Sequence, residues 1–184
     1  HISEAWLLPV LESLMEQFPF KIRSFHSDNG SEFINHRVAE LLNKLHVEQT
    51  KSRPRHSNDN GLVESKNGWV VRKHIGYGHI ASLHAEELNA FYREHFNAYL
   101  NFHRPCAVPE MVTSDNGKQK RVYHWYATPF EILRQLPGVA GFLRGDLTLD
   151  QLAQTAGTKS DTQTALQMQE VKYKLLTRLR QKSS

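Results

Sequence analysis

The sequence predicts an α/β fold in which helices connect the strands of a mostly parallel sheet. Within residues 1–105, segments with apolar side chains at spacings of three and four alternate with short β-prone runs. A helix between two strands is the kind of connection that parallel pairing requires. Functional residues in such sheets gather beyond the carboxyl ends of the strands. We therefore expect a functional site at these strand ends.

The first two predicted elements are a helix over residues 4–18 and a strand over residues 20–25. The helix is amphipathic, with apolar side chains at Leu7, Leu8, Leu11, Leu14, Met15 and Phe18. The strand, "FKIRSF", leads to Asp28, where the following Asn-Gly pair predicts a turn. The strand should therefore present Asp28 at its carboxyl end.

Five more elements are predicted before residue 105. They are a helix over 38–45, a strand over 46–50, a loop over 51–61, and helices over 62–75 and 83–103. The loop is rich in Pro, Ser, Asn and Gly, and the helix after it is weakened by Gly68. The last helix has a broad apolar face with several aromatic residues. This order assigns residues 1–105 to one α/β region.

Two smaller regions are predicted beyond Pro105. Residues 106–137 should form a small β-rich segment with a helix, and residues 138–184 a helical tail. The tetrapeptide "SDNG" at 27–30 recurs at 114–117, where it lies between two β-prone runs. An Asn-Gly pair in that setting is a hairpin signal, so Asp115 is expected to be a turn residue.

The region beyond Pro105 carries clear local signals. Thr128 with Glu131, and Thr148 with Gln151, have the spacing of a capping box at a helix start. Residues 160–182 predict an amphipathic basic helix. This helix could dock on the core, on another subunit or on DNA, and a partner helix is the favoured alternative.

Composition excludes several classes of protein. No apolar run approaches the roughly 18 residues that span a bilayer, so no membrane association is expected. Cys106 is the only cysteine, which excludes an internal disulfide framework, and no Cys or His pair has zinc-ligand spacing. We expect a reducing, cytoplasmic setting.

The positive charge is concentrated in one short segment. Six cations and two carboxylates lie between Lys51 and Lys73, which accounts for the whole net charge of +4. A basic stripe of this kind is typical of a polyanion-binding surface, although many charge runs are simply solvated. The stripe surrounds Glu64, which lies in the first turn of a predicted helix. Asp28 and Glu64 are therefore expected to converge beside a basic loop.

These residues carry a resemblance to a known family. "FHSDNGSEF" around Asp28, "NDNGLVESKNG" around Glu64, and the 35 residues between the two acids resemble the second half of the DDE catalytic core of transposases and retroviral integrases. "VVRKHIGY" and "AYLNFHRP" further resemble bacterial insertion-sequence transposases. The resemblance covers residues 1 to about 137. It implies that residues 1–105 are the C-terminal part of a ribonuclease H-like integrase core.

The chemistry implied by this resemblance is metal-assisted phosphoryl transfer on DNA. Asp28 and Glu64 would be catalytic residues and ligands of two Mg²⁺ or Mn²⁺ ions, which suit carboxylate oxygens. A third, bridging Asp lies several dozen residues upstream in the family, whereas 27 residues precede Asp28 here. The chain is therefore expected to be a truncated fragment, inactive without that Asp.

The resemblance also implies how DNA is bound. The candidate DNA-binding residues are Arg53, Arg55, His56, Asn60, Lys66, Arg72 and Lys73. The expected partner is double-stranded DNA, both element ends and target, with a homo-oligomer in the complex. In a bacterium, the protein would then be nucleoid-associated when bound. The alternatives are a noncatalytic DNA-binding or assembly fragment of the same ancestry and, more distantly, a nuclease of the ribonuclease H type.

Overall fold

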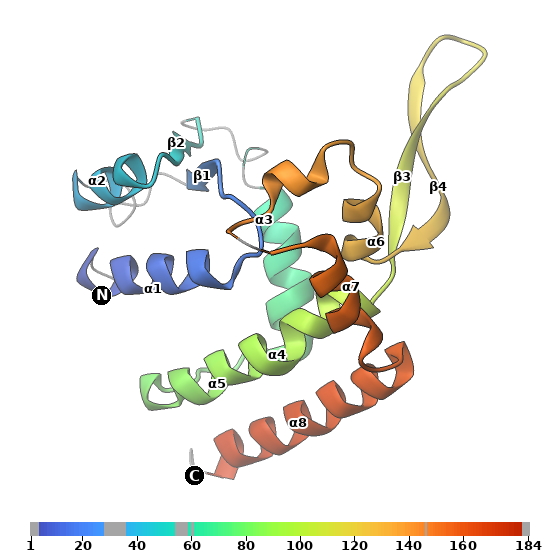
Figure 1. The fold of residues 1–184 in the computed structure, drawn as a ribbon. Helices are drawn as coiled ribbons and strands as arrows, with labels where there is room; N and C mark the ends of the chain where they lie inside the picture. Colours follow the sequence, from blue (N-terminus) through green and yellow to red (C-terminus); the bar gives the residue numbers. More distant parts are fainter. Residues whose placement is uncertain (1–3, 28–35, 54–58, 60, 146, 182–184) are drawn as a thin grey trace. The chain divides into compact units, whose positions relative to one another are not determined.

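The computed structural model describes residues 4–27, 36–53, 59, 61–145 and 147–181. The chain forms two compact units, His1–Gly78 and His79–Ser184, each with its own packed interior (Figure 1). Both units combine helices with a two-stranded sheet, so the predicted mixed α/β class is confirmed. The boundaries predicted at residues 105 and 137 concern domain organisation and stay predictions. Within the described part of the chain, every helix is too short or too polar to cross a membrane.

The first unit packs two helices around a small sheet. Helix α1 (Glu4–Gln17) and helix α2 (His36–Lys44) enclose a core with strands β1 (Ser24–Ser27) and β2 (Glu48–Lys51). The fully or nearly buried residues of this core are Leu11, Val38, Leu42 and Val47. The predicted helices over 4–18 and 38–45 and the strand near 46–50 are thus confirmed.

The two strands pair in parallel, as predicted. Ser24 lies opposite Glu48, and Ser27 lies opposite Lys51. The strand predicted over 20–25 is wrong in its bounds, because regular pairing begins only at Ser24. The physical reason is the short partner, since β2 starts opposite Ser24 and leaves residues 20–23 without a β2 residue to pair with. The strand nevertheless runs up to the residue before Asp28.

A continuous helix follows the basic loop over residues 51–61. It consists of α3 (Gly61–Lys66), the π-helical η2 (Asn67–Arg72) and α4 (Lys73–Ile75), which confirms the helix predicted over 62–75. The π-helical turns include Gly68. Such turns widen the helix locally and are frequent at functional sites.

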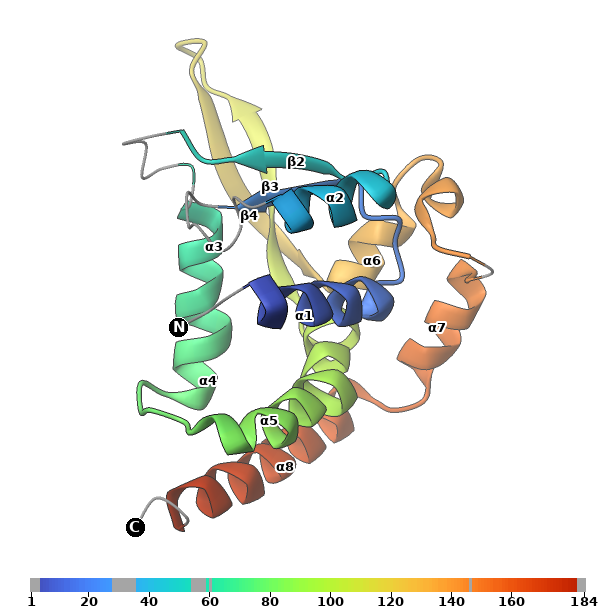
Figure 2. The same ribbon diagram turned by 90° about the vertical axis from the view of Figure 1, so that its left-hand side faces the viewer.

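The second unit is built on a long helical segment and a helix that packs along it. The segment comprises η3 (Ser82–His84), α5 (Ala85–Phe91), η4 (Tyr92–Phe96) and η5 (Tyr99–His103), and it confirms the helix predicted over 83–103. Helix α8 (Asp161–Gln181) lies beside it (Figure 2). The interface is apolar, with Phe91, Phe96, Met168, Leu175 and Leu179 buried. Of the three docking alternatives for the basic helix, the structure shows packing within its own unit.

A hairpin and three short helices complete this unit. Strands β3 (Cys106–Thr113) and β4 (Gln119–Ala127) pair antiparallel and are joined by the second SDNG. Helix α6 (Pro129–Arg134), η6 (Val139–Phe142) and helix α7 (Leu149–Gly157) follow. Both predicted capping boxes are present, at the starts of α6 and α7. Phe102 and Phe130 pack with ring centroids 5.3 Å apart, which joins η5 to α6.

Candidate metal and nucleic-acid site

The carboxyl ends of β1 and β2 are held together by backbone and side-chain hydrogen bonds. Ser52 N–H donates to the Ser27 carbonyl at 3.0 Å, which extends the pairing one residue beyond β2. Ser27 is 6% exposed, and its Oγ has no hydrogen-bond partner among the described residues. Asp28 follows directly in the sequence but lies outside the described residues. The sheet edge that precedes Asp28 is therefore well fixed.

His26 supports this edge structurally. Its Nδ1 lies 2.9 Å from Thr50 Oγ1, and its Nε2 lies 3.2 Å from Ser52 Oγ. Both ring nitrogens are thus engaged across the two strands. This confirms a structural role for His26 and shows how its imidazole connects β1 to the end of β2.

Glu64 lies on the first turn of α3 with an exposed side chain. The helix macrodipole and the free amides of the first turn favour an anion at this position. Glu64 makes no ion pair with any residue that the structure describes. Because its side chain is exposed, a ligand can reach its carboxylate from solvent.

Arg53 is not a free cation. Its guanidinium donates to both oxygens of Asp59, at 2.8 and 3.1 Å, and its backbone N–H donates to the same carboxylate at 2.9 Å. This hydrogen bonding, together with the charge of Asp59, raises the pKa of Arg53 above its ordinary value. Sequence reasoning treated Arg53 as a DNA contact and missed the partner that fixes its position.

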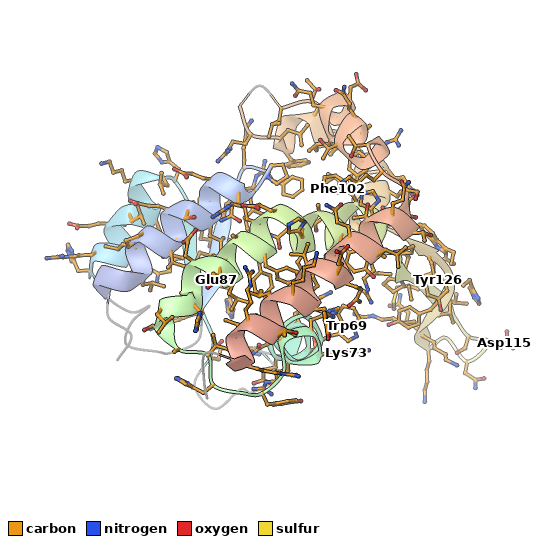
Figure 3. The ribbon with its side chains drawn as sticks, turned by 90° about the horizontal axis from the view of Figure 1, so that it is seen from below. Trp69, Lys73, Glu87, Phe102, Asp115 and Tyr126 are labelled. Carbon is orange, nitrogen blue, oxygen red and sulfur yellow. The ribbon has the colours of Figure 1, made fainter. Side chains whose placement is uncertain are left out.

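The cations of the following helix are partly engaged by aromatic rings. Lys73 Nζ lies 5.2 Å from the centroid of Trp69, and Figure 3 shows the two side chains together. The guanidinium of Arg72 lies 5.8 Å from the centroid of Tyr77. Lys66 is exposed. Lys73 and Arg72 keep N–H donors for other partners, because the face of an aromatic ring attracts a cation without accepting its N–H groups as an anion does.

Three other predicted contacts, Arg55, His56 and Asn60, lie outside the described residues. The role of Asp115 as a turn residue is confirmed. Gly117 N–H donates to the Ser114 carbonyl at 2.8 Å, and Gly117 has a positive φ of 72°. Asp115 lies at the exposed end of the hairpin (Figure 3).

The ligand atoms proposed for this site are carboxylate oxygens, which are the kind that a hard divalent ion prefers. Glu64 offers exposed carboxylate oxygens, and Asp28 would add more. Among the residues that the structure describes, no group of three or more His, Cys, Asp or Glu side chains is arranged to hold a metal. Because Asp28 is outside this set, the pairing of Asp28 with Glu64 stays a prediction.

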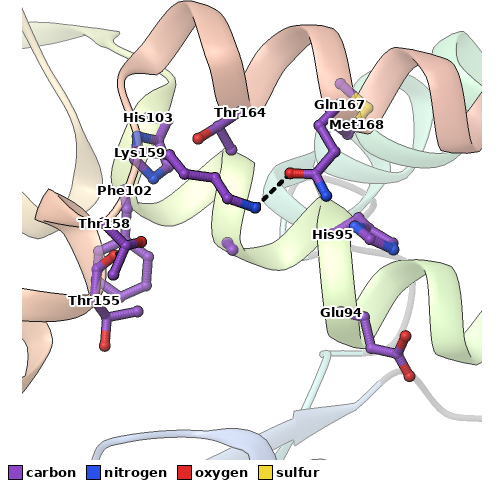
Figure 4. A pocket seen from close by; sticks show the side chains of 11 residues that line it. Glu94, His95, Phe102, His103, Thr155, Thr158, Lys159, Thr164, Gln167 and Met168 are labelled. Carbon is purple, nitrogen blue, oxygen red and sulfur yellow. Dashed lines mark hydrogen bonds between the residues drawn. The ribbon is translucent and has the colours of Figure 1, made fainter.

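The second unit contains a pocket that sequence reasoning did not find. It has a volume of about 250 Å³ and lies between the segment 92–103, the end of α7 and the start of α8 (Figure 4). Lys159 bonds Gln167, and the hydroxyls of Thr155 and Thr158 donate to backbone carbonyls, whereas the buried Thr164 Oγ1 has no hydrogen-bond partner among the described residues. The pocket lies at the junction of these three helical elements.

Comparison with known proteins gives one distant relative and no family. No protein-family model matches the chain. The chain is similar to the uncharacterized protein y4rM of Sinorhizobium fredii (strain NBRC 101917 / NGR234), with 29% identity over 118 residues. This match covers 64% of the chain and 34% of the relative, so the chain spans about a third of that protein's length.

Proposed function

We propose that this chain is part of a DNA transposase or integrase with a ribonuclease H-like core, in which Asp28 and Glu64 are catalytic carboxylates. The parallel pair β1–β2 carries the proposal. β1 ends one residue before Asp28, and β2 ends where the basic segment begins. Parallel strands place their carboxyl ends at one edge of a sheet, which is where α/β enzymes build their sites.

Two Mg²⁺ or Mn²⁺ ions, when bound, would activate the attacking oxygen and stabilise the leaving oxygen of a DNA phosphodiester. Asp28 and Glu64 would hold these ions. Glu64 suits this role because it is exposed and not engaged in an ion pair with any described residue. The backbone tie between Ser27 and Ser52 limits the movement of the sheet edge from which Asp28 follows.

The basic residues would bind the DNA backbone around this centre. Lys66, Arg72 and Lys73 follow Glu64 on the same helical segment, and their ammonium and guanidinium groups suit phosphate oxygens. Arg53 is held by Asp59, so it would contribute as a positioned donor rather than as a mobile cation. Arg55, His56 and Asn60 belong to the same proposed surface.

A third carboxylate is required by the resemblance and would come from an upstream segment. We therefore propose that the 184-residue chain alone does not cut DNA, and that joining it to a segment with the first Asp gives strand transfer. Double-stranded DNA is the proposed partner, with a homo-oligomer in the complex.

Binding of Mn²⁺ tests the two carboxylates without requiring catalysis. Asp28→Asn and Glu64→Gln should each weaken Mn²⁺ binding on the order of tenfold or more, measured by electron paramagnetic resonance. Asp115→Asn is the matched control, since it makes the same substitution in the second SDNG tetrapeptide. If all three variants bind Mn²⁺ as the parent chain does, the metal site is wrong.

Strand transfer tests the reaction itself. In the chain extended upstream through the first Asp, Asp28→Asn and Glu64→Gln should abolish joining of DNA ends, while Asp115→Asn should not. Metal-dependent cleavage by the 184-residue chain alone would contradict the requirement for a third carboxylate. DNA binding without metal binding in any form of the protein would favour the noncatalytic alternative.

A further inference from the structure

The β3–β4 hairpin is a highly exposed regular element of the second unit. Every residue from Pro109 to Arg121 is exposed, and Figure 1 shows the hairpin extending away from the helices of its unit. Strands of 8 and 9 residues give a ribbon roughly 26 to 30 Å long. The major groove of B-DNA, about 12 Å wide, admits a two-stranded ribbon of this kind.

The two faces of the hairpin differ. On one face, Trp125 Nε1 donates to Glu110 Oε1 at 2.7 Å, and the half-buried Val108 lies opposite Trp125. Side chains of the hairpin itself therefore cover the part of this face near Trp125, while Val112 further along β3 is 45% exposed. The bond to Trp125 also engages the Glu110 carboxylate.

The opposite face is left uncovered. By the strand register, Met111 pairs with Arg121 on this face, and Tyr126 lies on the same side opposite Ala107. Met111 is 56% exposed and Tyr126 is 70% exposed. Figure 3 shows Tyr126 on the hairpin. An exposed face with aromatic, thioether and guanidinium groups indicates a binding surface.

The positive charge on the distal half of the hairpin indicates an anionic partner. Lys118, Lys120 and Arg121 are exposed within four residues, and Asp115 is the carboxylate nearest to them in the sequence. None of the three cations forms an ion pair with a described residue. Unpaired cations at the end of a narrow ribbon are complementary to the phosphates that border a DNA groove.

We propose that the β3–β4 hairpin is a second DNA-binding element, which enters the major groove of duplex DNA. Lys118 and Lys120 contact phosphates, and Arg121 presents donors that match the O6 and N7 acceptors of guanine. The hairpin belongs to the second unit, whereas the residues proposed for the metal site belong to the first. The proposal rests on the proposed function only in taking duplex DNA as the partner.

A salt titration of duplex binding tests this element. The full 184-residue chain is titrated onto a short fluorescent duplex in EDTA, and affinity is followed by anisotropy over a range of salt. Changing Lys118 and Lys120 together to Ala should weaken binding on the order of tenfold at moderate salt. It should also reduce the slope of log affinity against log salt by up to about 2.

The matched control changes Lys159 and Lys174 to Ala, which removes the same charge from the same unit. Lys159 hydrogen-bonds to Gln167, and Lys174 pairs with Glu170. Because both lysines already have partners within the protein, neither is expected to contact DNA. Equal losses in the two double variants would attribute binding to net charge and overturn the proposal. Circular dichroism of each variant checks that the fold is kept.

Groove occupancy supplies an independent readout. Guanine N7 lies in the major groove, so the parent chain should protect it from dimethyl sulfate, and the Lys118 and Lys120 double variant should lose this protection. Binding without N7 protection would exclude the major groove. If the hairpin variant changes the sedimentation of the free protein without changing duplex binding, the face belongs to a second copy of the chain and the proposal is wrong.

The outcome also separates this proposal from the proposed function. If binding depends on Arg53 and Arg55 but not on Lys118 and Lys120, the hairpin proposal fails while the proposed function stands. If the chain binds no duplex at any salt concentration, both fail.

Discussion

His103 Nδ1 lies 3.0 Å from Asp161 Oδ1, which links the end of η5 to the first turn of α8. The carboxylate can only accept, so Nδ1 carries the donated proton. At the other end of the same interface, Arg178 lies 3.6 Å from Glu87. These two pairs show that the helical segment 85–103 and α8 run antiparallel.

The two ends of this interface should contribute unequally to stability. His103 is 5% exposed, so Asp161→Ala removes a hydrogen bond from a buried imidazole and should destabilise the second unit by about 1 to 2 kcal/mol. Arg178→Ala removes a largely exposed pair and should cost less than about 0.5 kcal/mol. Denaturant titration and amide hydrogen exchange along α8 measure both effects. Equal losses of stability in the two variants would show that burial of the His103 imidazole does not strengthen its bond to Asp161.

The basic loop should bind DNA phosphates beyond the effect of net charge. Changing Arg53 and Arg55 together to Ala should lower the slope of log affinity against log salt by up to about 2 and weaken binding to all sequences alike. Changing Arg23 and Lys44 to Ala is the control. Arg23 precedes β1, and Lys44 ends α2 before β2, so both lie toward the amino ends of the strands. If the control variant loses as much of the salt slope, net charge explains the binding, and the loop cations are solvated rather than in contact with phosphates.

Asp59 should restrain DNA binding by the same loop. Because its carboxylate accepts three hydrogen bonds from Arg53, Asp59→Asn should free a cation and remove a negative charge, and duplex affinity should rise by roughly two- to tenfold at low salt. Asp150→Asn, in the first turn of α7, removes an equal charge elsewhere. If both variants gain the same duplex affinity, the Arg53–Asp59 pair does not restrain DNA binding.

The capping boxes should differ in strength according to burial. Thr128 is 4% exposed, and its hydroxyl accepts from Glu131 N–H at 3.2 Å. Thr148 makes the same bond to Gln151 N–H in a more exposed position. Thr128→Ala should cost about 1 to 2 kcal/mol and Thr148→Ala about 0.5 to 1 kcal/mol, measured by thermal unfolding. The reverse order would contradict the burial argument.

Two glycines offer a matched pair of backbone tests. A Cβ added to Gly68 or to Gly117 would meet no atom within 4 Å, but only Gly117 has a positive φ. Gly68→Ala should therefore stabilise the helix by about 0.5 to 1 kcal/mol, whereas Gly117→Ala should destabilise the hairpin by about 1 kcal/mol. If both substitutions stabilise the protein, the hairpin turn tolerates a side chain at Gly117. If both destabilise it, the π-helical turns require glycine at Gly68.

The sequence by itself determined the features that depend on neighbouring residues. Helix spans follow from apolar spacing, the hairpin turn from its Asp-Asn-Gly, and the caps of α6 and α7 from Thr and Glu or Gln three residues apart. Their hydrogen bonds join residues within four positions. Local sequence is therefore sufficient to specify them.

Only the tertiary structure decided the pairings between distant residues. β1 is shorter than its apolar pattern suggests because β2 offers only four partners. His103 finds Asp161 58 positions away because apolar burial aligns α8 with the segment 85–103. Arg53, which looks like a free cation in the sequence, is bound by Asp59, six positions further along the chain. Such contacts depend on packing between segments, which no local pattern specifies.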